Sequence, residues 1–253
     1  MFIACTARLS VYAYSMLSQM KFPALFRRRS LLLPTLSGWL MILLVLGAIS
    51  TLLFRNLALF LTVNEPVGAD YLVIEAWMSK EELDQSYAYF DEHDYSLAIL
   101  VGGPITNDFH EMDSNYARRA ANYLALKGMS LDKMAVVEVP HSAQNRTFLN
   151  AVYVREWFDK QGIEANSIDV FSSPAHTRRS RDLYRIALGD KVDVGVVASN
   201  PEDYDPYRWW RSSSSGKSIV AEFAGWLLVK CCFDPGEPGS HFEKWGIEKK
   251  PGD

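Results

Sequence analysis

The sequence predicts an α/β fold: a Rossmann-like three-layer domain with a mostly parallel five-stranded sheet, preceded by one N-terminal transmembrane helix. Three observations support this prediction. Beyond Gly68, short β-branched and apolar runs alternate with amphipathic stretches, as in βαβ units. These runs are nearly continuous in apolar residues, which is typical of strands covered on both faces of a parallel sheet. An uncharged stretch of 25 residues, Ser30–Phe54, precedes them.

Each strand is expected where an apolar run is bounded by turn residues. The five runs are Asp70–Ala76, Leu97–Val101, Met134–Val139, Ile168–Phe171 and Val192–Ala198. Ser79 with Glu82 three residues later has the spacing of a capping box, so a helix begins after the first run. The other expected helices are Ser114–Lys127, Asn145–Lys160, one that begins after Pro174, and Lys217–Val229. Strand and helix therefore alternate along the chain.

The uncharged stretch is long enough to cross a bilayer. Its most apolar part, Leu36–Phe54, would span about 28 Å as a helix, close to the hydrocarbon thickness. A cleaved signal peptide is the alternative, but the run is long for one and no clear small-residue cleavage site follows. We expect one uncleaved anchor within residues 31–63. Met20-Lys21 would begin a more ordinary anchor, so whether residues 1–20 belong to the native start stays open.

Charge divides the chain at this anchor. Residues 1–64 carry six basic and no acidic residues, whereas the remainder carries a net charge of −10. The positive-inside rule places residues 1–30 in the cytoplasm and a domain of residues 65–232 outside, in a single-pass protein of the inner (cytoplasmic) membrane. The acidic outer part argues against nucleic acid as a partner. Residues 233–253, rich in Pro, Gly and charge, are expected to be disordered.

Several common site types lack support in the sequence. The three cysteines give no disulfide framework, and the neighbours Cys231 and Cys232 are not expected to bridge. The segment His110–Asp113 has no second ligand pair at recognisable spacing, so no metal site is expected. Without a G-x-G-x-x-G motif no nucleotide cofactor is expected, and Gly216-Lys217-Ser218 lacks the earlier glycine of a phosphate-binding loop.

The strongest candidate site lies at Val170–Arg181, where the fourth strand ends and a helix begins. Ser172 and Ser173 supply hydroxyls at the strand end. His176 and Arg179 are three residues apart and share one helical face, near backbone N–H groups and the positive end of the helix dipole. This arrangement favours anions, with His176 as a general acid or base. The plainer interpretation is a surface helix start with scattered basic residues.

Other candidates lie at neighbouring strand ends, where parallel sheets bind ligands. Gly102 and Gly103 would let backbone approach an anion, unless they only permit the turn before Pro104. Thr147 and Asn150 are three residues apart at a helix start, where the alternative is capping and solvation.

The last helix and the loop before it add further polar and aromatic candidates. Glu222 lies in a mostly apolar helix and needs a partner such as an arginine. Trp209 and Trp210 either pack that helix onto the sheet, line a groove or touch the bilayer.

The segments with these candidate residues resemble the ElyC/SanA/YdcF family, once catalogued as a domain of unknown function. The resemblance covers roughly residues 68–230, and the chain would be a divergent member. Gly102-Gly103, the Thr-x-x-Asn spacing of Thr147 and Asn150, and the run Ser172–Arg179 carry the resemblance. It implies a Rossmann-like domain facing the periplasm and a role in cell-envelope biogenesis. The family's glycine cluster after the first strand is Glu75-Ala76-Trp77 here, and a family carboxylate in the third helix is replaced by Leu149.

A second family carboxylate is also missing, because Asn115-Tyr116 stands where the family has Glu-Ala. If these carboxylates do chemistry in the family, Glu75 or Glu111 would have to substitute, which makes Glu75 a catalytic candidate. Two functions follow. The chain is either an anchored envelope protein that acts on or binds a phosphate-bearing, lipid-linked precursor, or a non-catalytic scaffold that binds an anion or a partner.

Overall fold

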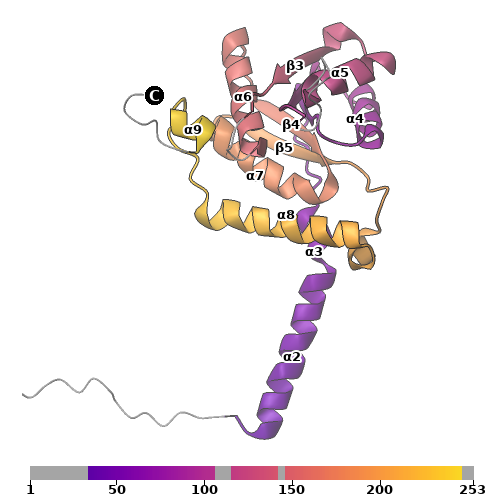
Figure 1. Ribbon diagram of the computed structural model, residues 1–253, viewed down its shortest axis with the longest axis vertical. Helices are drawn as coiled ribbons and strands as arrows, with labels where there is room; N and C mark the ends of the chain where they lie inside the picture. Colours follow the sequence, from indigo (N-terminus) through magenta and orange to yellow (C-terminus); the bar gives the residue numbers. More distant parts are fainter. Residues whose placement is uncertain (1–33, 106–114, 142–145, 247–253) are drawn as a thin grey trace, which may run out of the picture. The chain divides into compact units, whose positions relative to one another are not determined.

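The computed structural model describes residues 34–105, 115–141 and 146–246 (Figure 1). The described part contains one five-stranded sheet with all strands parallel in the order β3-β2-β1-β4-β5. The strands are β1 (Tyr71–Glu75), β2 (Leu97–Gly102), β3 (Met134–Glu138), β4 (Ser167–Ser172) and β5 (Asp193–Ala198). All five predicted strands and the predicted α/β class are confirmed. The strand order reverses between β1 and β4, and such switch points are where open α/β sheets bind ligands.

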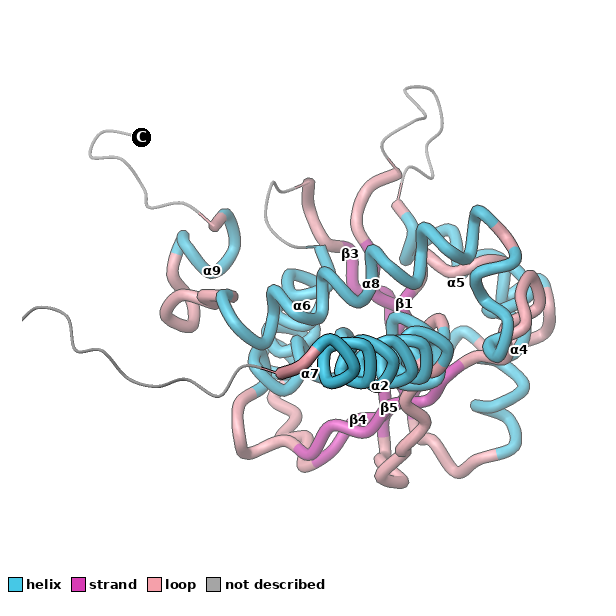
Figure 2. Tube along the Cα trace, turned by 90° about the horizontal axis from the view of Figure 1, so that it is seen from below, coloured by secondary structure: helices cyan, strands magenta, loops and turns pink. Residues whose placement is uncertain are grey.

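Helices cover both faces of the sheet; Figure 2 separates them, in cyan, from the strands in magenta. On one face, α4 (Lys80–Glu92) and α5 (Tyr116–Leu126) pack on residues such as Ile74 and Leu100. On the other, α6 (Arg146–Gln161) and α7 (Thr177–Leu188) pack on a valine-rich core. The central strands β1, β2 and β4 thus bury both of their faces, which explains why β1 and β2 are apolar without alternation. The edge strand β3 leaves Val136 exposed.

The start of α4 is the predicted capping box. The backbone N–H of Glu82 donates to the Ser79 hydroxyl at 3.2 Å, and the backbone N–H of Ser79 donates to the Glu82 carboxylate at 3.0 Å. Two helix N–H groups without intrahelical partners are thereby satisfied. The cap fixes where α4 leaves the carboxyl end of β1.

The candidate membrane helix is α2 (Leu36–Arg55), which has the length and composition to span a bilayer and buries none of its residues. It is shorter than the predicted anchor of residues 31–63. After one intervening residue the chain forms α3 (Leu57–Leu61), in which Ala58 and Leu61 are fully buried. The chain divides into two compact units, residues 1–48 and 49–253, so α3 belongs to the folded unit.

A third apolar cluster joins α3 to the last long helix, α8 (Ser213–Cys232), and to the short helix η3 (Pro206–Arg211) before it. Trp209 lies at its centre, 1% exposed, and its indole N–H donates to the Phe54 carbonyl at 3.2 Å. Trp209 therefore packs α8 against α3 and the last turn of α2. Of the three alternatives expected for Trp209, helix packing is the one observed, but against α3 and the end of α2 and not against the sheet.

The tail of residues 233–253 was expected to be disordered, but residues 233–246 have a described structure. They include α9 (His241–Trp245), where Glu243 is 2% exposed and accepts hydrogen bonds from the Arg155 guanidinium at 2.8 Å to both carboxylate oxygens. Composition did not reveal this order because Arg155 is 88 residues away in the sequence. The Sγ atoms of the neighbours Cys231 and Cys232 lie close together at the end of α8.

Candidate functional site

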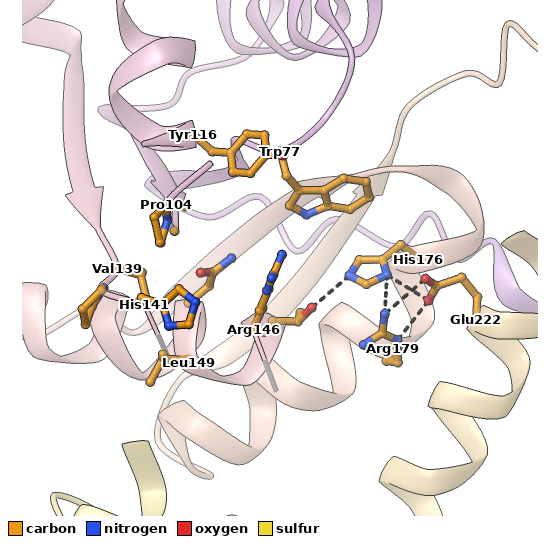
Figure 3. A pocket seen from close by; sticks show the side chains of 15 residues that line it. Trp77, Pro104, Tyr116, Val139, His141, Arg146, Leu149, His176, Arg179 and Glu222 are labelled. Carbon is orange, nitrogen blue, oxygen red and sulfur yellow. Dashed lines mark hydrogen bonds and ion pairs between the residues drawn. The ribbon is translucent and has the colours of Figure 1, made fainter. Parts of the chain in front are cut away.

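A cavity of about 400 Å³ opens at the carboxyl ends of the strands (Figure 3). It brings together seven residues singled out in the sequence, contributed by β2, the loop after it, α6, η2 (Pro174–His176), α7 and α8. These are Gly102, Gly103, Thr147, Asn150, His176, Arg179 and Glu222. Segments up to 120 residues apart thus converge on one site. Glu75, Ser172 and Ser173, also predicted, do not line this cavity.

His176 is the centre of a hydrogen-bonded chain. Its Nδ1 lies 2.9 Å from Glu222 Oε2, and its Nε2 lies 3.2 Å from the Thr147 hydroxyl. Arg179 Nη2 lies 3.0 Å from the same Nδ1. In the neutral ring with its proton on Nδ1, Nε2 accepts the Thr147 O–H; in the imidazolium, Nε2 donates to that hydroxyl. The side chains therefore form a hydroxyl–imidazole–carboxylate series, with the carboxylate orienting the base. Trp77 packs edge-on against the imidazole with ring centroids 5.1 Å apart.

Glu222 also binds Arg179, through its Oε2 to Nε at 2.9 Å and its Oε1 to Nη2 at 3.1 Å. Burial by itself raises the pKa of the Glu222 carboxyl, but the hydrogen bond and charge of His176 and those of Arg179 outweigh burial and lower the pKa to about 2. The expectation that Glu222 needs an arginine partner agrees with this geometry. The Nε and Nη2 groups of Arg179 are thus paired with a carboxylate, and the anion-binding role expected for Arg179 stays a prediction.

A glycine that the sequence analysis did not single out allows this pairing. A Cβ at Gly225 of α8 would lie 3.1 Å from Arg179 Nε and 3.2 Å from its Cδ. The bare backbone of α8 at this position lets the guanidinium lie close against the helix. Only the tertiary contact between α7 and α8 reveals this use of the glycine.

Glu75 lies behind His176 and has no exposed surface. Its Oε2 accepts hydrogen bonds from the Ser180 hydroxyl at 3.0 Å and from the Ser172 hydroxyl, and lies 3.6 Å from His176 Nε2. The prediction that Glu75 is itself catalytic therefore needs correction, because its carboxylate does not reach the cavity. It can position and polarise the imidazole. Burial raises the pKa of the nearby Tyr184 hydroxyl, and the negative charge of Glu75 raises it further.

Neither Ser172, the last residue of β4, nor Ser173 after it lines this cavity. The burial of Ser172 contradicts the substrate-binding role expected for it, whereas that role stays a prediction for Ser173. Ser172 is fully buried against Glu75. Ser173 donates to Glu82 Oε1 and lines a second cavity of about 500 Å³, which shares Trp77, His176 and Glu222 with the first. Carboxylates and hydroxyls dominate the second cavity: Glu81, Glu82, Glu202, Asp203, Ser214, Ser215 and Ser218 also line it. His176 and Glu222 thus separate two polar spaces.

Gly102 is required for packing rather than for a phosphate loop. A Cβ there would lie 2.8 Å from Tyr116 Cβ and 3.0 Å from the Ala117 nitrogen, so only glycine lets the end of β2 meet the start of α5. A Cβ at Gly103 would lie 3.7 Å from the Val139 carbonyl, an ordinary contact. The Gly102 carbonyl accepts from the Val139 N–H at 2.9 Å, and Gly103 accepts from Tyr116 N–H at 2.9 Å.

Sequence reasoning missed four lining residues: Trp77, Tyr116, His141 and Arg146. Arg146 is exposed, lines the cavity and forms no ion pair with another residue of the described ranges. Figure 3 shows its guanidinium between His141 and His176 in this view. A cation in the first turn of a helix interacts unfavourably with the helix dipole. The place of Arg146 at the start of α6 is therefore the sequence feature that could have indicated a functional role.

The chain matches no protein-family model, and no curated protein matches it significantly. Fold and site alone define its class. It is a Rossmann-like α/β protein with one candidate membrane helix among its described residues and a cavity that contains a hydroxyl, an imidazole and a carboxylate at the sheet's switch point. No group of three or more His, Cys, Asp or Glu side chains suited to a metal occurs among the described residues, and His110–Asp113 lie outside them.

Proposed function

We propose that the chain is a membrane-anchored extracytoplasmic protein of cell-envelope biogenesis that acts on a phosphate-bearing, lipid-linked glycan precursor. The observation that carries this proposal is the series Thr147–His176–Glu222 on the wall of a cavity that also contains Arg146. The resemblance of Gly102-Gly103, Thr147 with Asn150, and Ser172–Arg179 to an envelope family supports the same substrate class.

Phosphoryl transfer fits these groups. The Nε2 atom of His176 takes the proton of an attacking hydroxyl as the oxygen of that hydroxyl bonds to phosphorus. The bond from phosphorus to the leaving oxygen breaks, and the imidazolium returns the proton to that oxygen. Glu222 and the buried Glu75 stabilise the imidazolium between these two steps. Thr147 holds the Nε2 position until the attacking hydroxyl replaces it.

Two further observations support a glycan phosphate as the substrate. Arg146 supplies a cation without an ion-pair partner among the described residues, and guanidinium binds phosphate oxygens bidentately. The second cavity offers hydroxyls and carboxylates, which suit the hydroxyl groups of a neutral sugar and repel a second anion. The phosphate then lies on the Arg146 side of His176 and the sugar on the serine side.

The test uses the full chain in lipid vesicles with a polyprenyl-diphosphate-linked disaccharide as the probe. Mass spectrometry should detect conversion of the probe by the unaltered protein. His176→Gln should slow conversion by roughly 10²–10⁴-fold, the usual contribution of a general base. Arg146→Gln should weaken binding by about tenfold or more, as expected for one charge-assisted hydrogen bond. The control Lys191→Gln changes an exposed cation after α7 and should alter neither quantity.

The second candidate is a non-catalytic module that binds an anion or a partner protein. One observation favours it: His176 is only 4% exposed, and its Nδ1 side is closed by the ion pair of Glu222 with Arg179. This function predicts that the probe binds without conversion, that Arg146→Gln weakens binding, and that His176→Gln leaves binding unchanged. Such a result would contradict the enzyme proposal and leave the binding site intact.

A further inference from the structure

Helix α8 has two faces with different surroundings. Its inner face carries Glu222, which binds His176, and the buried residues Ile219 and Val229. Its outer face consists of Val220, Ala221, Ala224, Leu227 and Leu228, all exposed. At 100° per residue these five positions lie opposite Glu222 and Trp226 on the helix. We call this set the α8 outer face.

The α8 outer face is large and apolar for an exposed surface. Val220 is 54%, Leu227 49% and Leu228 61% exposed, and no other described element covers them. Phe60 of α3 contacts Trp226 on the inner side of α8, with ring centroids 5.0 Å apart, and so does not cover the outer face. Contiguous apolar surface of this kind marks a site of contact with a membrane or a protein.

The position of α8 in the folded unit indicates which partner covers this face. The indole of Trp209, directly before α8, donates to the carbonyl of Phe54, in the last turn of the candidate membrane helix. Phe54 and Trp209 are also in ring contact, at 4.6 Å. Helix α8 is therefore packed at the point where the chain leaves the apolar span.

The charges near α8 fit a lipid surface. Exposed cations precede or begin the helix at Arg208, Arg211 and Lys217, within reach of anionic headgroups. Arg55 lies over the Trp210 ring at 5.7 Å, so a cation and an aromatic ring meet at the end of α2. Tryptophan with neighbouring cations is typical of the headgroup level of a bilayer.

We propose that α8 is an interfacial helix whose outer face inserts into the bilayer surface on the side where α2 ends. It cannot span the membrane, since its inner face packs on the folded unit. Interfacial helices bury their apolar face about 5–10 Å into the boundary between headgroups and acyl chains. The inner face then holds Glu222 and His176 about one helix diameter, roughly 10 Å, above the lipid. This inference rests on α2 and α8 and not on the chemistry of the cavity.

The experiment measures the depth of single positions in the full chain. Cys5, Cys231 and Cys232 are replaced by serine, and a cysteine is introduced as Leu228→Cys or Ala224→Cys and labelled with the fluorophore NBD. The protein is placed in vesicles of phosphatidylethanolamine and phosphatidylglycerol that carry a nitroxide on the upper acyl chain. The matched control is Leu126→Cys, since Leu126 is 89% exposed at the end of α5.

We expect the labels at 224 and 228 to show blue-shifted emission and strong nitroxide quenching, and the label at 126 to show neither. Equal quenching at 228 and 126, with water-like emission at both, would overturn the inference. A blue shift at 228 that grows with the protein-to-lipid ratio and resists nitroxide quenching would also overturn it, because a second copy of the chain would then cover this face. The result is independent of whether the probe substrate is converted.

Discussion

The Glu222 carboxylate is the residue on which the geometry of the site depends. It binds the imidazole of His176 and the guanidinium of Arg179 with the same oxygen, Oε2. Because the Glu222 carboxylate holds both side chains, loss of its negative charge would weaken both interactions. Protonation of Glu222 should therefore lower the stability of the fold, in a pH range set by the pKa of Glu222.

The pKa of Glu222 predicts an acid-dependent loss of stability. In the folded chain it is about 2, below the ordinary value of 4.5. Ionised Glu222 therefore stabilises the fold above the unfolded pKa, and this contribution is lost as pH falls from 4.5 towards 2. At about 1.4 kcal/mol per unit, the loss is on the order of 3 kcal/mol. Glu222→Gln should remove this part of the pH dependence.

Urea unfolding of the full chain in detergent, repeated across this pH range, measures the effect. Glu164→Gln changes an exposed carboxylate and should leave the profile like that of the unaltered protein. If Glu222→Gln and the unaltered protein lose free energy of unfolding equally on acidification, Glu222 does not hold its ion pairs as described.

At the scale of elements, the junction of β2 with α5 depends on the absence of a side chain at Gly102. Gly102→Ala would bring a methyl group within 2.8 Å of Tyr116 Cβ and should destabilise the fold by about 1–3 kcal/mol. Gly103→Ala meets only a contact at 3.7 Å and should be nearly neutral. Thermal unfolding of both variants checks this; equal melting temperatures would show that α5 does not pack closely on the strand end.

The strands and helices could be predicted from short sequence patterns, because each strand is marked by an apolar run within its own residues. Tyr71–Glu75 and Leu97–Gly102 are apolar runs whose burial on both faces is visible in their composition. Thr147 and His176 were likewise found from their places at helix starts after strands. Features that depend on distant partners were not predictable. The burial of Glu75 is one of these, since it requires hydroxyls about 100 residues away.

At the scale of the whole molecule, the C-terminal segment is held to the domain by one buried ion pair. Glu243→Gln would leave the Arg155 guanidinium, 20% exposed, without its charged partner and should cost about 3 kcal/mol or more of unfolding free energy. Glu156→Gln, which breaks the more exposed pair with Lys244 between the same two helices, should cost less than about 1 kcal/mol. Chemical unfolding compares the two variants. Equal costs would mean that α9 is not docked through Arg155.

The charge asymmetry predicts which side of the membrane the cavity occupies. Three arginines, Arg27–Arg29, precede the apolar span, and acidic Glu65 and Asp70 follow it. Under the positive-inside rule a C-terminal alkaline phosphatase fusion should be active and a C-terminal green fluorescent protein fusion dark in bacterial cells. Replacing all three arginines by glutamine should reduce the phosphatase activity, because it leaves only Arg8 and Lys21 before the span, both farther from it than Arg55 on the other side.

Fusions to the N-terminus provide the matched control, with the opposite pattern expected. A fluorescent C-terminal fusion without phosphatase activity would reverse the orientation and place the cavity in the cytoplasm. That result would contradict the proposed role in the cell envelope, which requires the cavity to lie outside the cytoplasm. The interfacial position of α8 would remain, because that inference depends on which end of α2 the helix packs against and not on which compartment that end faces.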